Sequence, residues 1–293
     1  MLVAVLAALA AGACFALAGV LQQRAAVRLP DHDALSFRLL RTLARRPMWR
    51  AGIALAFAAY GFQALALAFG PLSLVQPLII SELLFAIPLS ARLRRRPLGA
   101  REWTGTLAVT AGLATALAAA RPHGGDPVVP LGSWLITLAS VGALVALTLA
   151  VCTRVTGPAR ASLLGLAGGL VMGTQSMLLA ATVDTMARDV VALFAAWQTY
   201  LLVGASIAGL LLIQSAFQAG PLAASMPVMD ATEPLVAVTV GVAVFDETLR
   251  TGWLPTSLSA LGVAGLVCGI VLLDTSPLLK RLELPEPSRP PHR

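Results

Sequence analysis

The chain has 293 residues, of which 58% are apolar and only 12% charged, and its mean hydropathy is +0.83. A soluble domain of this length would carry about twice that fraction of charged residues. The composition therefore excludes a soluble globular protein and predicts an all-α integral membrane protein. Its net charge of +7 comes mostly from arginines between the apolar runs, which argues against nucleic-acid binding.

Nine apolar runs are long enough to cross about 30 Å of hydrocarbon, which takes about 20 helical residues. They cover residues 2–23, 51–69, 71–91, 102–120, 131–152, 161–182, 192–213, 221–244 and 253–273. The first run has no basic segment before it and is followed by Arg24 and Arg28. This arrangement predicts a retained membrane helix and not a cleaved signal peptide.

The positions of Arg and Lys predict how the chain is oriented. If the N-terminus lies outside, the inner segments hold 18 basic residues and the outer ones three, which are Arg121, Arg188 and Arg250. Basic residues accumulate on the cytoplasmic side, so we expect the N-terminus outside and the C-terminus inside. Arginine dominates over lysine, which suggests a GC-rich bacterial genome and a multi-pass protein of the bacterial inner membrane.

Two segments outside the apolar runs have their own character. Residues 34–47 alternate leucines with arginines and end at Pro47, which predicts a basic amphipathic helix lying on the inner leaflet. Residues 277–293 are rich in proline and are expected to form a disordered cytoplasmic tail.

Two stretches resemble each other at a distance of 150 to 151 residues. The shared positions are Gln63, Gly70-Pro71 and Pro77 in the first stretch and Gln214, Gly220-Pro221 and Pro227 in the second. One residue restored after Pro77 places Glu82 opposite Glu233. By the charge count, the first Gly-Pro turn lies outside and the second inside, so the copies run in opposite directions. Such inverted repeats are typical of secondary transporters.

The repeat divides the chain into two unequal halves. Residues 1–120 form the first, with four spans and the amphipathic helix, and residues 121–276 form the second, with five spans. We therefore expect an inverted-repeat bundle of the 4+5 type, followed by the tail.

Three acidic residues, Glu82, Asp230 and Glu233, lie near the middle of expected spans. A carboxylate in hydrocarbon costs at least about 2.5 kcal/mol on insertion scales, so such residues usually have a function. Asp230 and Glu233 share a helix face, and Glu82 is expected to face Glu233 across a central cavity. The three are candidate ligands of a substrate, a coupling ion or a metal ion. The alternative is that each is protonated and hydrogen-bonded to a neighbouring helix.

Amide side chains and prolines supply further candidates. Gln63, Gln175 and Gln198 are expected to line the same cavity, whereas Gln22, Gln23 and Gln214 are explained by helix ends at the membrane interface. Because proline lacks an N–H and blocks the helical hydrogen bond, six prolines are candidate helix-breaking or gating positions: Pro71, Pro77, Pro88, Pro221, Pro227 and Pro234.

Glycines at Gly165, Gly169 and Gly173 repeat every four residues within one expected span. This spacing is typical of a surface on which two helices approach closely. Such a surface can form a homodimer, but packing within the bundle is the preferred interpretation, because most helices here must bury against neighbours.

No catalytic motif is present. The chain contains no HExxH, GxSxG or Walker A sequence and no paired Cys/His set, and nothing places a nucleophile beside a base. We therefore expect neither enzymatic activity nor a cofactor. The expected partners are the lipid bilayer and a small-molecule or cation substrate, without nucleic acid.

The two Gly-Pro-Leu turns, Glu233-Pro234 and the run Phe245-Asp246-Glu247-Thr248-Leu249 resemble the EamA-like repeats of the drug/metabolite transporter superfamily. The resemblance covers about residues 50–120 and 131–273. It departs from the usual five-plus-five arrangement of ten spans, and Arg96 stands where the first repeat normally shows the acidic motif.

Within that superfamily, the nine-span count and the run Pro71-Leu-Ser-Leu-Val-Gln-Pro77 resemble the NIPA-type magnesium transporters. The resemblance implies a secondary transporter that moves a small metabolite or cation by alternating access, with Mg²⁺ transport as a narrower variant. The residues themselves also leave open a non-transporting membrane scaffold or accessory protein.

Overall fold

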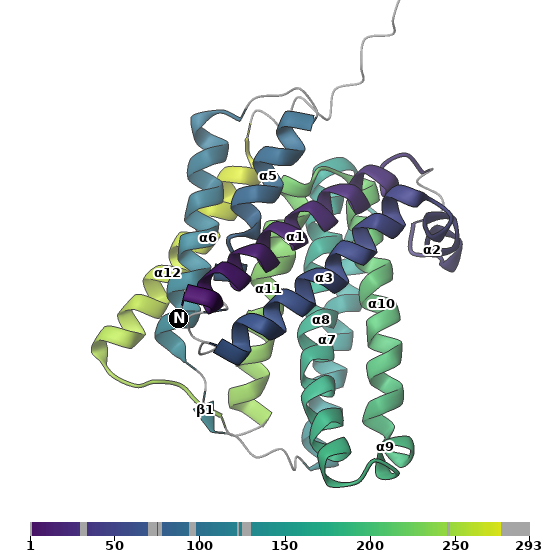
Figure 1. Cartoon of the computed structure of the whole chain (residues 1–293), viewed down its shortest axis with the longest axis vertical. Helices are drawn as coiled ribbons and strands as arrows, with labels where there is room; N and C mark the ends of the chain where they lie inside the picture. The colour runs from purple at the N-terminus through teal and green to yellow at the C-terminus, as the bar shows by residue number, and fades with distance from the viewer. Residues whose placement is uncertain are drawn as a thin grey trace, which may run out of the picture.

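The computed structural model describes residues 2–29, 34–69, 75, 78–93, 98–121, 123–124, 130–244 and 247–276, and these ranges are almost entirely helical (Figure 1). The helices are α1 (Leu2–Ala26), α2 (Phe37–Ala44), α3 (Pro47–Phe69), α5 (Glu82–Leu93), α6 (Ala100–Ala120), α7 (Leu131–Cys152), α8 (Gly157–Arg188), α9 (Ala192–Ala195), α10 (Trp197–Ala219), α11 (Leu222–Val244) and α12 (Trp253–Asp274). The prediction of an all-α membrane protein is confirmed. Six of these helices, α1, α6, α7, α8, α10 and α12, are long and apolar enough to cross a membrane.

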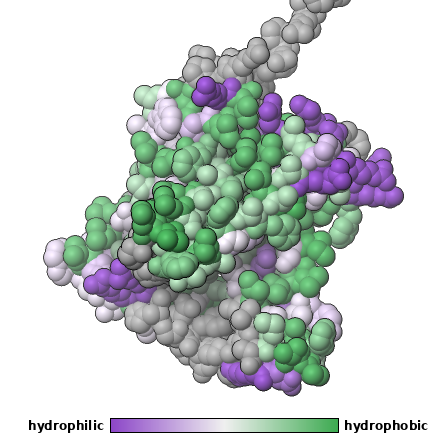
Figure 2. All heavy atoms as spheres, viewed as in Figure 1, coloured by the Kyte–Doolittle hydropathy of each residue, from purple (hydrophilic) through white to green (hydrophobic). Residues whose placement is uncertain are grey.

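The outer surface of the bundle is apolar, as a lipid environment requires. Large side chains such as Ile136, Leu147, Val203 and Leu261 are all exposed. Hydrophobic residues cover much of the face seen in Figure 2. In water so large an apolar surface would drive association, whereas hydrocarbon solvates it.

Contacts at both ends of the bundle join the α6 segment to the α12 segment. At one end, β1 (His123–Gly124) pairs antiparallel with β2 (Glu247–Thr248), near the bottom of Figure 1. The Arg250 N–H also donates to the Ala120 carbonyl at 2.9 Å. At the other end, the Arg101 side chain donates to the Leu272 carbonyl at 3.3 Å. Helices α6 and α12 therefore run antiparallel along their whole length.

Glycines allow α6 and α12 to touch backbone to backbone. A Cβ built on Gly112 would lie 2.6 Å from the Gly262 carbonyl oxygen, and a Cβ on Gly262 would lie 2.6 Å from that of Gly112. Gly105 and Gly269 form a second such pair, at 3.1 and 2.7 Å. Close approach of this kind increases van der Waals contact where lipid provides no hydrophobic driving force between helices.

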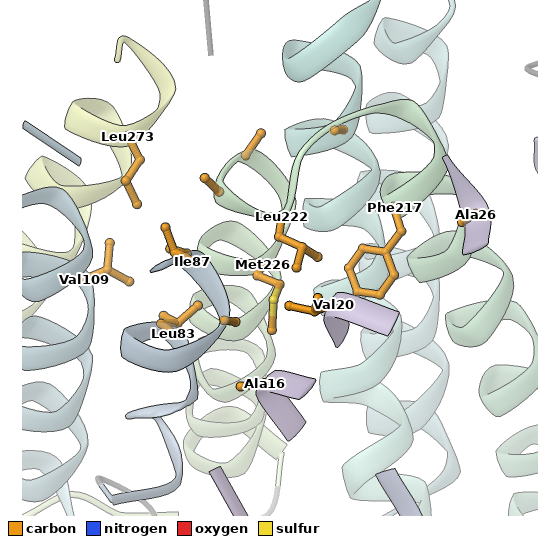
Figure 3. Close-up of a cluster of buried hydrophobic side chains, with 14 of the residues drawn as sticks. Ala16, Val20, Ala26, Leu83, Ile87, Val109, Phe217, Leu222, Met226 and Leu273 are labelled. Carbon is orange, nitrogen blue, oxygen red and sulfur yellow. The ribbon is translucent and has the colours of Figure 1, made fainter. Parts of the chain in front are cut away.

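The centre of the molecule is filled by apolar side chains from α1, α5 and α11 (Figure 3). We call the group Val20, Leu83, Ile87, Leu222 and Met226 the apolar layer, and each of its members is at most 3% exposed. Leu83 and Ile87 follow Glu82 along α5, while Leu222 and Met226 precede Asp230 along α11. The apolar layer therefore lies on one side of the acidic residues, toward the end of α5 and the start of α11.

Candidate functional site

Glu82 lies near the middle of the expected span 71–91, at a point where the structure interrupts the helix. Helix α5 begins at this residue, directly after a turn at Ile80 and Ser81. The Ser81 hydroxyl donates to the Leu78 carbonyl at 2.6 Å and so closes that turn. Helix α1 packs against it at Gly12, where an added Cβ would lie 3.1 Å from the Ile79 carbonyl oxygen. Gly12 therefore gives the turn the space that a Cβ would occupy.

The partner of Glu82 across the bundle is Asp230 of α11. The two side chains form a hydrogen bond, and Glu82 also lies within electrostatic range of Glu233. An ionised carboxylate only accepts hydrogen bonds, so a bond between two carboxyl groups requires one proton. All three acidic side chains are half-buried. We refer to Glu82, Asp230 and Glu233 as the carboxyl cluster.

Glu233 has a hydrogen-bond partner that the sequence did not predict. Its Oε1 accepts a 3.4 Å hydrogen bond from the Ser176 hydroxyl of α8. Glu82 was expected to face Glu233, and the two lie within electrostatic range, while the hydrogen bonds join Glu82 with Asp230 and Ser176 with Glu233. Ser176 was not among the predicted residues, although it follows Gly173 by three positions and so shares its helix face.

The glycines of α8 hold α11 in place beside the carboxyl cluster. A Cβ on Gly165 would lie 2.6 Å from the Ser225 carbonyl oxygen, one on Gly169 would lie 2.8 Å from that of Met229, and one on Gly173 would lie 2.8 Å from that of Glu233. The close-packing surface predicted from these glycines is therefore used inside the bundle, against the helix that carries two of the three acids. This contact leaves these three glycines no role in a homodimer.

One aromatic ring lies near the acids, and a second ring packs against it. Tyr60 of α3 is within electrostatic range of Glu233 and Glu82. Its ring meets Phe15 of α1 edge to face, with centroids 5.0 Å apart. Aromatic faces attract cations, so rings and carboxyl groups together favour a positively charged ligand. The position of Phe15 could not be inferred from its sequence context, because it is one apolar residue among many.

The chemistry of the carboxyl cluster fits a proton or a cation held by one or two carboxylates. Within the described ranges, no group of three or more His, Cys, Asp or Glu side chains is arranged to hold a metal ion. Asp230 Oδ2 is buried and has no hydrogen-bond partner in that part of the chain. This oxygen is therefore open to the proton shared with Glu82 or to a bound cation.

The predicted glutamines occupy separate places. Gln63 is half-buried on α3, and Gln175 is half-buried on α8 next to Ser176. Gln175 Oε1 is buried without a hydrogen-bond partner among the described residues. Gln198 lies in the first turn of α10, beside α9 at the lower end of Figure 1. Of the three, Gln175 lies nearest in sequence to a side chain that contacts the carboxyl cluster.

The prolines do not end the helices in which they lie. Helix α11 continues through Pro227 and Pro234, and α5 continues through Pro88. Each proline still removes one helical N–H, so Pro234 deprives the Asp230 carbonyl of its usual donor. Pro221 lies in the turn between α10 and α11. Pro71 and Pro77 fall outside the described residues.

Three polar side chains connect the two halves of the chain near the ends of α1 and α10. The Gln214 side-chain amide donates to Gln22 Oε1 at 2.6 Å, and Gln214 Oε1 accepts from the Trp49 indole N–H at 3.0 Å. Gln22 and Gln214 are both buried. Their assignment to the membrane interface was therefore wrong, because protein and not lipid surrounds them. We call these three residues the polar clasp.

The Gln214→Ala variant is expected to lower the free energy of unfolding by about 1–3 kcal/mol, because it leaves buried donors and acceptors on Trp49 and Gln22 without a partner. Thermal unfolding followed by tryptophan fluorescence measures this change. Ser206→Ala on the same helix is the matched control, since the Ser206 hydroxyl bonds the Leu202 carbonyl of its own helix, one turn back, at 2.7 Å. Equal unfolding temperatures for the two variants would contradict a structural role for the clasp.

Comparison with known proteins gives one whole-length relative. An uncharacterized protein of Corynebacterium glutamicum is 32% identical over 295 residues, a match that covers 98% of this chain and 98% of the relative. No family model matches the chain. No solved structure matches it either. The description of the relative names no activity, so the function has to be argued from the carboxyl cluster and its surroundings.

Proposed function

This chain belongs to the same protein family as the Corynebacterium glutamicum relative, and we propose that it is a secondary transporter of the bacterial inner membrane. It would move a small metabolite or cation by alternating access, as its resemblance to the drug/metabolite transporter superfamily implies. The observation that carries the proposal is the hydrogen bond between Glu82 of α5 and Asp230 of α11. It places a titratable pair between two halves of a membrane bundle, where acids are expensive and usually functional.

The pair provides a physical basis for coupling. With one proton the two carboxyl groups attract each other, and with none they repel. Two unit charges about 4 Å apart repel by about 4 kcal/mol at an effective dielectric constant of about 20. Loss of the proton is therefore favourable only when a cation takes its place or when α5 and α11 separate. Either event links the charge of the site to the relative position of the two halves.

The surroundings of the pair support alternating access. The apolar layer covers the carboxyl cluster on the side of the α11 start, and the polar clasp lies toward the same end of the bundle. We propose that this end faces the cytoplasm and is sealed in this conformation. Nine spans would each cross the membrane once, in two inverted halves with the N-terminus outside. Eight of them are α1, α3, α6, α7, α8, α10, α11 and α12, and the ninth is the expected span 71–91, whose second half lies in α5.

The proposal is tested by current measurements on the purified chain in liposomes on a solid-supported membrane. The panel comprises Mg²⁺, Na⁺, pH steps, amino acids and amines, with wild type beside Glu82→Gln and Glu233→Gln. A current with one solute that both variants lose is the expected result. Response to Mg²⁺ alone would select the magnesium variant, and response to an organic solute with a pH gradient would select the metabolite variant.

Asp274→Asn is the matched control, because Asp274 is an exposed acid at the end of α12, where it accepts a hydrogen bond from Ser162. It should carry current like wild type. Currents that persist in both glutamine variants would overturn the assignment of the site. Silence of well-folded wild-type protein across the whole panel would count against transport and in favour of a scaffold or accessory role.

A further inference from the structure

Helix α2 is attached to the protein and not simply to the membrane. The sequence predicted an amphipathic helix lying on the inner leaflet, and Leu39 and Leu43 of its apolar face are 0% exposed and belong to the central core cluster. Helix α2 packs against α3 and α10. The apolar face expected to anchor it in the leaflet is therefore already buried, and its remaining surface is available for another partner.

That remaining surface is basic. Arg41 and Arg45 lie on the side of α2 opposite the two leucines, given 3.6 residues per turn, and both are exposed. Arg28 after α1 and Arg50 in the first turns of α3 are exposed as well. Figure 2 shows the hydrophilic surface that gathers around α2, on the right of the molecule. The segment 24–50 holds seven arginines and only two aspartates, so its sequence charge is +5.

One aromatic residue distinguishes this patch from a purely polar one. Phe37, the first residue of α2, is 71% exposed. A bulky apolar side chain beside arginines is the composition of a surface that rests at the boundary between headgroups and acyl chains. The helix also lies at the end of α1 and the start of α3, where membrane-spanning helices leave the hydrocarbon.

We propose that α2, with Arg28 and Arg50 beside it, is a binding site for anionic phospholipid headgroups of the inner leaflet. Arginine binds the phosphodiester of a phospholipid through two parallel N–H groups. The net positive charge of the patch favours an anionic headgroup over a zwitterionic one, in which a quaternary ammonium or amine offsets the phosphate charge. Phe37 supplies the contact with the acyl region that free phosphate cannot use. This site is separate from the carboxyl cluster and does not depend on what the protein transports.

Occupancy of the site would stabilise the contact between the two halves. The Leu35 N–H, just before α2, donates to the Ser215 hydroxyl of α10 at 3.0 Å. Just after α2, Trp49 donates to Gln214 in the polar clasp. A lipid that holds α2 in place therefore also holds both flanking hydrogen bonds, so binding should raise the unfolding temperature.

The test adds lipid to the purified full chain in a neutral detergent and measures binding by native mass spectrometry and stability by thermal unfolding. Phosphatidylglycerol, phosphatidylcholine and inorganic phosphate are compared. Wild type is expected to retain phosphatidylglycerol and to gain thermal stability from it alone. Arg41→Gln/Arg45→Gln/Arg50→Gln should weaken that binding by on the order of 100-fold, at about fivefold for each arginine.

Arg92→Gln/Arg154→Gln/Arg250→Gln removes the same charge from exposed arginines elsewhere on the chain and is the matched control. It should bind phosphatidylglycerol like wild type. Equal phosphatidylglycerol binding by the two triple variants would overturn the site, and so would equal binding of phosphatidylcholine and phosphatidylglycerol by wild type. The α2 arginines would then serve only to set the orientation of the chain in the membrane. Stabilisation by inorganic phosphate to the same extent would identify an anion site without lipid selectivity, which also contradicts the proposal.

Discussion

The Asp230→Asn variant is expected to fold at least as well as wild type and to lose transport by about 30-fold or more. Asparagine keeps the size of the side chain and can donate its amide N–H to Glu82, so the contact between α5 and α11 survives. It removes a charge that must otherwise share a partly buried site with two other acids. Loss of one partner of a charged, buried contact typically costs about 2–5 kcal/mol, which is a factor of about 30 or more in affinity.

Two measurements on the same protein separate a transport role from a structural one. Thermal unfolding should show an unchanged or higher midpoint for Asp230→Asn, because repulsion within the carboxyl cluster is relieved. Solid-supported membrane currents should fall below detection, including the response to a pH step. If Asp230 has only a structural role, Asp230→Asn should show the reverse pattern. Its unfolding temperature should fall, and its currents should fall only as far as the amount of folded protein does. Wild-type currents from Asp230→Asn would remove the acid from the mechanism.

Helix positions were the most predictable part of this fold. The run expected at 131–152 appears as α7 (Leu131–Cys152), and the run expected at 221–244 appears as α11 (Leu222–Val244). Apolar runs of about 20 residues bounded by glycine, proline or arginine leave few alternatives in hydrocarbon, where every backbone polar group must be satisfied within the segment. Helix α8 extends further than expected because it continues to Arg188, beyond the apolar run that ended at 182.

Contacts between helices were less predictable. The repeat alignment drew attention to Glu82 and Glu233, and the acid that bonds Glu82 is Asp230, one turn before Glu233 on α11. A difference of one turn depends on how far two helices slide past each other, and a single sequence carries little information about that. Gln214 was misassigned for a related reason, since a glutamine near a helix end looks the same whether lipid or Trp49 lies beside it.

The Gly173→Leu variant is expected to lower the unfolding temperature by about 10 °C and to displace Glu233. An added Cβ at Gly173 would lie 2.7 Å from Val236 Cβ and 2.8 Å from the Glu233 carbonyl oxygen. A backbone atom cannot move aside as a side-chain end can, so α8 and α11 must separate at the level of the carboxyl cluster. Overpacking of this kind costs about 1–3 kcal/mol or more, and each kcal/mol lowers the midpoint by about 2–4 °C in a chain of this size.

Gly204→Leu on α10 is the control, because a Cβ at Gly204 meets no atom within 4 Å. Gly204→Leu should be neutral or slightly stabilising, since leucine favours a helix by nearly 1 kcal/mol over glycine.

The mass of the detergent-solubilised particle distinguishes packing within the bundle from a dimer contact at the glycines of α8. Contact within the bundle predicts that Gly173→Leu keeps the wild-type mass and loses stability. A dimer contact would give the opposite result, a smaller particle with an unchanged midpoint. Because Gly173 meets the backbone of the residue whose carboxylate Ser176 binds, the same substitution should also reduce transport in the protein that remains folded.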